Sequence, residues 1–183
     1  MIEPFRVRVP DSALADLHRR LAETRLVSPA AGEPWESGVD YQYLAHLVEY
    51  WGGQFDWRRQ EEWLNSFDQY MAKLGDQEVH FVHVRADRNR YPDVIPIVLS
   101  HGWPYSFVEF LSIVGWLTDP LPRGGTPADA FDVVVPSLPG YGYSSPLVDD
   151  PFTGDVVARL CHTLMTEVLG YDRYATYGDV VGS

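Results

Sequence analysis

The sequence predicts an α/β fold in which a β-hairpin and parallel strands with crossover helices follow a helical N-terminal segment. Two apolar runs rich in β-branched residues, 95–99 and 131–135, have the length of buried strands, and each precedes a stretch with helical spacing. Residues 1–66 contain no comparable strand pattern. We therefore expect two parts, a helical segment over residues 1–66 and a sheet-containing part over residues 67–183.

Three helices are predicted in the N-terminal segment, over residues 11–26, 40–53 and 56–64. Asp11 and Asp40 are suitable N-caps for the first two helices, because a carboxylate accepts hydrogen bonds from the free N–H groups of a first turn. The segment has no strand of its own on which to pack. We therefore expect its apolar faces to cover another surface.

From residue 67 the apolar pattern changes to alternation, which predicts a hairpin over residues 70–85 with its turn at Gly75. His80 and His83 lie in the second strand of this hairpin. Residues three apart on a strand point to opposite faces, so we do not expect these histidines to share a metal ion. The sequence predicts no metal site.

The run at residues 95–99 is the predicted central strand, buried on both faces. Gly102 permits a tight turn after it, and Pro104 cannot donate to a sheet ladder. Ser106 and Glu109 have the spacing of a capping box that opens the next helix. The carboxyl end of this strand therefore meets a turn with free backbone N–H groups, which is where open α/β sheets bind ligands.

A second crossover follows, with a strand at residues 131–135, a helix at 154–169 and a last strand at 173–177. Connections of this length are right-handed crossovers and predict a parallel sheet. The last strand would leave an unpaired edge flanked by Tyr174 and Tyr177. Such an edge predicts self-association unless another chain covers it.

Composition narrows the class of partner. The 183 residues carry a formal net charge of −12, and 45% of them are hydrophobic. This charge repels phosphate backbones, so we exclude nucleic acid and expect a small apolar ligand. No signal peptide is recognisable and no apolar run approaches the roughly 20 residues of a membrane span, so we expect a cytoplasmic protein without membrane partners. The single Cys161 lies on an apolar helical face, as a buried structural thiol would.

The chain ends in Gly178-Asp-Val-Val-Gly182-Ser183. Small residues four apart, flanking a central one, are what a sharp strand-to-helix elbow requires, because bulk at the flanks would collide in the turn. The central residue of this predicted elbow is Val180.

Together these segments resemble the microsomal-type epoxide hydrolases, which have the α/β-hydrolase fold and a helical N-terminal extension. The resemblance spans residues 5–183. It rests on His101-Gly-Trp-Pro104, Ser106-Phe-Val-Glu-Phe110, Leu117-Thr-Asp-Pro120, Ser137-Leu-Pro-Gly-Tyr-Gly-Tyr-Ser144 and the elbow, in that order. It implies hydrolysis of an epoxide-like substrate to a vicinal diol, a role in detoxification, and no metal or organic cofactor.

The resemblance also implies a mechanism and a set of site residues. An elbow aspartate attacks an epoxide carbon, a His-activated water hydrolyses the resulting ester, and lid tyrosines protonate the epoxide oxygen. The backbone N–H groups of Trp103 and Val181 would hold the oxyanion. Trp103, Pro104, Tyr141 and Tyr143 would contact the substrate, although core and loop packing accounts equally well for each aromatic residue.

The sequence departs from the family in two ways. Ungapped matching puts Val180 at the nucleophile position, and Asp179 as the centre would have the bulky Tyr177 and Val181 as its flanks. We therefore expect Asp179 not to be a competent nucleophile. After Ser183 no residues remain to supply the lid tyrosines, the orienting acid or the catalytic histidine, and none of the six histidines takes that last place.

Two functional hypotheses follow. In the first, the chain is epoxide hydrolase-like but inactive or weakly active alone. In the second, it is a non-catalytic binding or interaction module derived from an α/β-hydrolase. A serine esterase is a weaker third hypothesis, because Ser183 lies outside the elbow centre and Ser100 lies within a strand.

Overall fold

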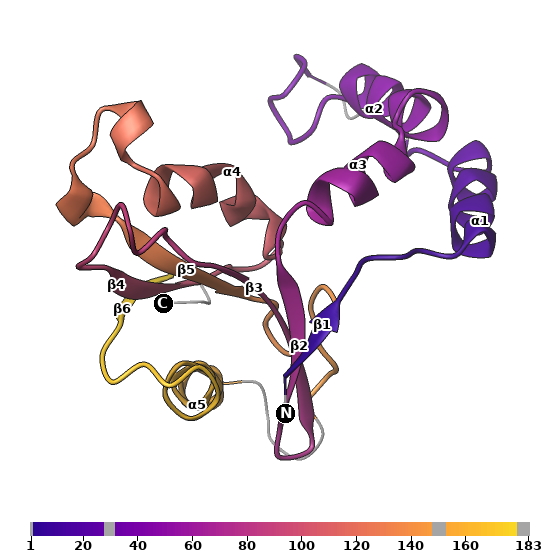
Figure 1. The fold of residues 1–183 in the computed structure, drawn as a ribbon. Helices are drawn as coiled ribbons and strands as arrows, with labels where there is room; N and C mark the ends of the chain where they lie inside the picture. The colour runs from indigo at the N-terminus through magenta and orange to yellow at the C-terminus, as the bar shows by residue number, and fades with distance from the viewer. Residues whose placement is uncertain (1, 28–31, 148–152, 179–183) are drawn as a thin grey trace. The chain divides into compact units, whose positions relative to one another are not determined.

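The computed structural model describes residues 2–27, 32–147 and 153–178 (Figure 1). The strands are β1 (Ile2–Phe5), β2 (Gln69–Leu74), β3 (Gln77–Val84), β4 (Ile95–Ser100), β5 (Phe131–Pro136) and β6 (Ala175–Gly178). The α-helices are α1 (Asp11–Ala22), α2 (Tyr41–Gly53), α3 (Trp57–Leu64), α4 (Val108–Thr118) and α5 (Gly154–Thr163). Asp179, Val180 and Val181 of the predicted elbow lie outside the described residues.

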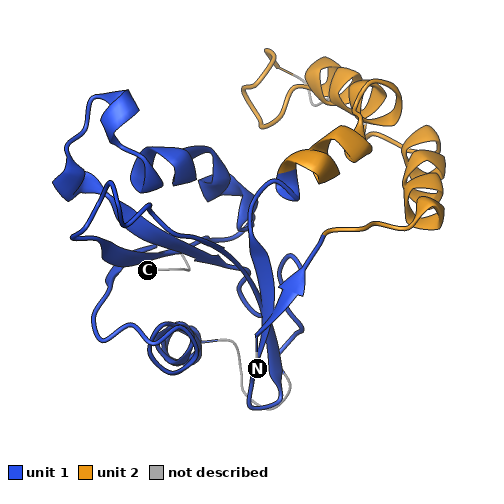
Figure 2. Ribbon diagram, viewed as in Figure 1, with its two compact units in different colours: residues 1–6, 64–183 blue, residues 7–63 orange. Residues whose placement is uncertain are grey.

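The chain divides into two compact units, shown in Figure 2. The sheet unit comprises Met1–Arg6 and Leu64–Ser183, and the helical unit comprises Val7–Trp63. The division differs from a single cut after residue 66, because the first strand belongs with the sheet. Within the described residues, no helix combines the length and apolar character needed to cross a bilayer.

The sheet unit is built on one mixed sheet with the order β1-β2-β3-β5-β4-β6. β4 pairs in parallel with both β5 and β6, while β1, β2, β3 and β5 are joined by antiparallel pairing. The parallel pairing predicted from the strand–helix–strand pattern is confirmed. Figure 1 shows α4 and α5 on opposite faces of this sheet.

With helices on both faces, β5 is buried from Asp132 to Pro136, which explains why it contains a run of valines rather than an alternating pattern. Val134 and Val98 pack with Phe81 in one apolar cluster, which also contains Leu164 and Met165. These last two residues lie in a π-helical turn, Leu164–Val168, that continues α5. The helix predicted over residues 154–169 is therefore present but changes from α to π geometry after Thr163.

The strand β1 was not expected from the sequence. Ile2–Phe5 pairs antiparallel with β2, Phe5 lying opposite Gln69. Pro4 lowers the strand propensity of so short a segment, but β1 is an edge strand, which is where a sheet tolerates proline. The N-terminal segment thus contributes a strand to the sheet as well as helices.

In the helical unit, Asp40 caps α2 as predicted, since its carboxylate accepts the Tyr43 N–H at 2.9 Å. Asp11 is instead the first residue of α1, and its carboxylate pairs with Arg58. α1 ends at Ala22 rather than near Leu26.

The predicted capping box of α4 does not form. The helix begins at Val108 with Phe107 as its N-cap, and the Ser106 hydroxyl accepts only a long, 3.4 Å hydrogen bond from the Val108 N–H. The Glu109 N–H donates to the Ser106 carbonyl instead. The chain is already turning at residues 102–105, so that the helix starts one residue later than the side-chain pattern suggests.

Candidate functional site

The carboxyl ends of β4 and β6 lie side by side, because Ser100 pairs with Gly178 in the parallel ladder. The His-Gly-Trp-Pro segment follows β4 directly, and the predicted elbow follows Gly178 in the sequence. The two segments that the sequence assigns to catalysis therefore start from the carboxyl ends of two neighbouring strands. This is the position at which open α/β sheets bind ligands.

The turn after β4 exposes its central side chains. The Tyr105 N–H donates to the Gly102 carbonyl at 2.9 Å, and the Trp103–Pro104 peptide bond is cis. Trp103 is 65% exposed and Tyr105 is 55% exposed. The accessibility of Trp103 and Pro104 is what a contact with a ligand requires, although the contact itself stays a prediction.

His101, at the start of this turn, is fully buried. Its Nε2 accepts a hydrogen bond from the Leu138 backbone N–H at 3.1 Å, and its Nδ1 lies 3.3 Å from the Gly102 carbonyl oxygen. An acceptor at Nε2 places the ring proton on Nδ1. Burial lowers the pKa of His101 and favours this neutral form. Its only free lone pair is engaged by a backbone donor, so His101 has a structural role.

The loop after β5 carries Tyr141 and Tyr143, which the sequence predicts as substrate contacts. Tyr141 packs edge-on against the His101 ring, with centroids 5.2 Å apart. Tyr143 packs against the rings of Phe5, His80 and Phe107, at centroid distances of 5.1, 5.3 and 6.1 Å. Tyr141 therefore lies beside the turn after β4, whereas Tyr143 belongs to an aromatic cluster.

Gly142 makes this loop possible. Its φ is +52°, and a Cβ at this position would lie 2.5 Å from the Ser137 hydroxyl oxygen. The loop therefore passes too close to Ser137 for any side chain at residue 142.

Sequence reasoning missed a second buried histidine beside this loop. His80 Nδ1 lies 2.8 Å from the Ser137 hydroxyl, and its Nε2 lies 3.0 Å from Gln69 Oε1. The Gln69 amide nitrogen donates to the Leu64 carbonyl, so Gln69 Oε1 accepts from His80 Nε2–H and the Ser137 hydroxyl donates to Nδ1. Burial lowers the pKa of His80 to about 4. This Ser–His–Gln chain is sealed from solvent, so it holds the loop rather than attacking a substrate.

Comparisons with known proteins agree with this arrangement. The profile of the epoxide hydrolase N terminus matches residues 2–110, which is more than half of the chain. The chain belongs to the epoxide hydrolase family. It is 42% identical over 177 residues to a putative epoxide hydrolase of Stigmatella aurantiaca, and 36% identical over 180 residues to Epoxide hydrolase 1 of Oryctolagus cuniculus. Each match covers 97% of this chain and 39% of the relative, so the chain spans about two fifths of the curated relatives.

Solved structures of epoxide hydrolases are also similar to this chain. The Aspergillus niger epoxide hydrolase matches with a TM-score of 0.83 at 33% identity, covering 100% of this chain and 47% of the other. The juvenile hormone epoxide hydrolase of Bombyx mori matches with a TM-score of 0.88 at 26% identity, with the same coverage. These likenesses confirm the partial α/β-hydrolase fold predicted from the sequence.

A second polar network in this chain lies toward the amino end of β5. The buried Asp132 accepts hydrogen bonds from the Ala86 N–H at 3.0 Å, from Arg88 at 2.6 Å and from the Tyr171 hydroxyl at 2.8 Å. His83 Nε2 lies 2.9 Å from the same hydroxyl. Tyr171 gives its only proton to Asp132, so His83 must donate from Nε2.

The same network shifts the pKa values of its members. Burial lowers the pKa of His83 to about 4, and burial together with the Asp132 carboxylate raises the pKa of Tyr171 to about 12. His80 and His83 bind different partners, in line with their predicted opposite faces. Over residues 2–27, 32–147 and 153–178, no group of three His, Cys, Asp or Glu could hold a metal ion.

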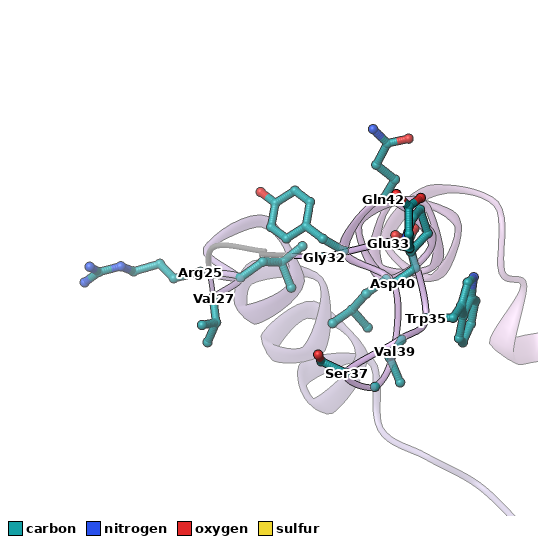
Figure 3. A pocket seen from close by; sticks show the side chains of 14 residues that line it. Arg25, Val27, Gly32, Glu33, Trp35, Ser37, Val39, Asp40 and Gln42 are labelled. Carbon is teal, nitrogen blue, oxygen red and sulfur yellow. The ribbon is translucent and has the colours of Figure 1, made fainter. Parts of the chain in front are cut away.

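The helical unit contains a hollow of about 610 Å³, shown in Figure 3. Its lining includes Arg25, Trp35 and Asp40, and the Asp40 carboxylate already serves as the N-cap of α2. No histidine or cysteine of the described residues lines it. The candidate active site therefore stays at the ends of β4 and β6.

Proposed function

We propose that this chain supplies the sheet, the oxyanion turn and the elbow region of an epoxide hydrolase that converts small apolar epoxides to vicinal diols through an aspartyl ester. The observation that carries the proposal is that β4 and β6 end side by side, with the accessible turn of Trp103 directly after β4. Ring strain assists attack by a carboxylate, and the Trp103 N–H would stabilise the oxyanion when water hydrolyses the ester. A role in detoxification and a cytoplasmic location are part of this proposal.

The chain alone is proposed to turn over epoxides weakly or not at all. Activating a water requires a base with an accessible lone pair. Among the buried histidines of the sheet unit, His80 and His101 have both ring nitrogens in hydrogen-bonding contacts and His83 is bound to Tyr171, so none of these three offers such a lone pair. The presence of Val180 at the centre of the sequence-predicted elbow supports the same conclusion.

Styrene oxide, a small apolar epoxide, tests this function on the purified chain. Diol is measured by chromatography and covalent adducts by mass spectrometry. We expect no diol above the uncatalysed rate and no adduct on Asp179. Val180→Asp should form one alkyl-ester adduct at residue 180 without turnover, because the nucleophile is restored and the base is not. Val180→Asn is the matched control and should form none.

Diol formation by the unaltered chain, or an ester on Asp179, would overturn the proposal of low activity. The alternative function is a non-catalytic binding module, which the exposed aromatic rings of Trp103 and Tyr105 favour. Saturable binding of styrene oxide without an adduct, even in Val180→Asp, would support this alternative over the hydrolase.

We also propose self-association through the edge of β6. In the part of the chain that the structure describes, β6 pairs with β4 along one side only. Lysine on an edge strand opposes pairing with another chain, so Thr176→Lys should shift the protein toward the monomer in light scattering. Ala158→Lys adds the same charge at an exposed position of α5 and should leave the molecular mass measured by light scattering unchanged. A monomeric unaltered protein at high concentration would refute this proposal.

A further inference from the structure

Two loops at the candidate active site are joined by one side chain. His101 belongs to the turn after β4, and its Nε2 accepts the backbone N–H of Leu138 in the loop after β5, across a separation of 37 residues in the sequence. The ring of the same histidine supports Tyr141, farther along that loop. The loop that carries Tyr141 thus has both a backbone and a ring contact to His101.

The hydrogen-bonding direction determines which form of the imidazole can make this link. A backbone N–H can only donate, so Nε2 must be without a proton and the ring must be the neutral Nδ1–H form. The Nδ1–H is then directed at the carbonyl of Gly102, the residue before Trp103. One ring nitrogen therefore holds the loop after β5, and the other holds the turn after β4.

Within the described residues, the Leu138 N–H has His101 Nε2 as its hydrogen-bond acceptor and no other. His101 is fully buried and Leu138 is 2% exposed, so loss of the acceptor would strand a donor away from water. The same loss would remove the imidazole contact to the Gly102 carbonyl, which belongs to the same peptide unit as the Trp103 N–H, and would leave the Tyr105 N–H as its donor. A side chain of equal bulk without an acceptor would fill the space but not preserve the link.

We propose that His101 is a positioning residue: its neutral imidazole holds the turn that presents the Trp103 N–H against the loop that carries Tyr141. The turn that would bind the oxyanion and the loop whose Tyr141 would contact the substrate are then held in one fixed arrangement relative to each other. The catalytic meaning of this link rests on the proposed function, whereas the link itself does not.

The test compares His101→Leu, which removes the acceptor, with His101→Gln, whose Oε1 can occupy the place of Nε2. Amide hydrogen exchange is followed by NMR at Leu138, with the Val134 amide of β5 as an internal reference. His101→Leu should speed exchange at Leu138 at least about tenfold relative to Val134, the effect of losing one buried hydrogen bond, and should shift the Trp103 amide resonance. His101→Gln should restore protection at Leu138. Nitrogen-15 spectra of the unaltered protein should show the proton on Nδ1.

A second arm measures the dissociation constant of styrene oxide, which should rise about tenfold in His101→Leu if positioning supplies about one hydrogen bond's worth of affinity. Met165→Ala, a core truncation beside α5, controls for general destabilisation and should change neither readout at the site. Unchanged exchange in His101→Leu, a proton on Nε2, or no rescue by glutamine would overturn the positioning role. Faster exchange with unchanged affinity would support that role and count against a substrate rim at Tyr141.

Discussion

Acidification from about pH 7 to about pH 5 is expected to lower the free energy of unfolding of the sheet unit by as much as about 4 kcal/mol. Burial lowers the pKa of His80 and of His83 to about 4 in the folded chain, below the ordinary value of 6.5. The unfolded state therefore binds more protons between these values, and each histidine costs up to about 1.4 kcal/mol per pH unit there. Their contribution is complete above pH 6.5 and is lost as the pH falls toward 4.

Urea unfolding followed by circular dichroism at a series of pH values measures this slope. His80→Gln should reduce it by about a third to a half, because one of three buried imidazoles is gone and the third, His101, also has a lowered pKa. His18→Gln, which removes an exposed imidazole of the helical unit, is the control. Equal flattening by both variants would show that burial of His80 is not the cause.

Replacement of Asp132 by alanine is expected to lower the free energy of unfolding by about 3 kcal/mol. The carboxylate accepts hydrogen bonds from the Ala86 N–H, the Tyr171 hydroxyl and Arg88. Alanine leaves the first donor unsatisfied at a buried position and deprives Tyr171 of its acceptor. The loss is measured by urea unfolding at neutral pH.

Asp132→Asn keeps the shape and one acceptor, so it should be destabilising by less than Asp132→Ala. Asp172→Ala removes an exposed carboxylate and should change stability by no more than about 0.5 kcal/mol. Tyr171→Phe in the Asp132→Ala background should add little, because both residues act in one network. Full additivity of those two substitutions would contradict the network.

Much of the sheet follows from local patterns in the sequence. The valines of β5 and the apolar run of β4 are long enough and bounded sharply enough to predict buried strands, and Gly75 marks the hairpin turn. β1 escaped prediction because four residues containing Pro4 have no strand signature, and only their pairing with β2 makes them a strand. The Ser106–Glu109 spacing was misleading because the preceding turn, which no local pattern reveals, delays the start of α4.

The candidate site was predictable in outline only. The motif at residues 101–104 predicts the turn and its free N–H groups from residue types alone. The hydrogen bond between His101 and Leu138 depends on which loops the parallel sheet brings together, so no spacing rule could reveal it. The pairing of His80 with Ser137 is of the same kind, since it joins residues 57 apart in the sequence.

The pairing of β1 with β2 has a consequence for how the protein is made. Phe5 meets Gln69 only after the ribosome has released the whole of the helical unit. Closing so long a flexible segment costs roughly 4 kcal/mol of chain entropy, and a helical unit that has already become compact reduces that cost. During synthesis the nascent helical unit therefore precedes the sheet edge that its own N-terminal strand completes.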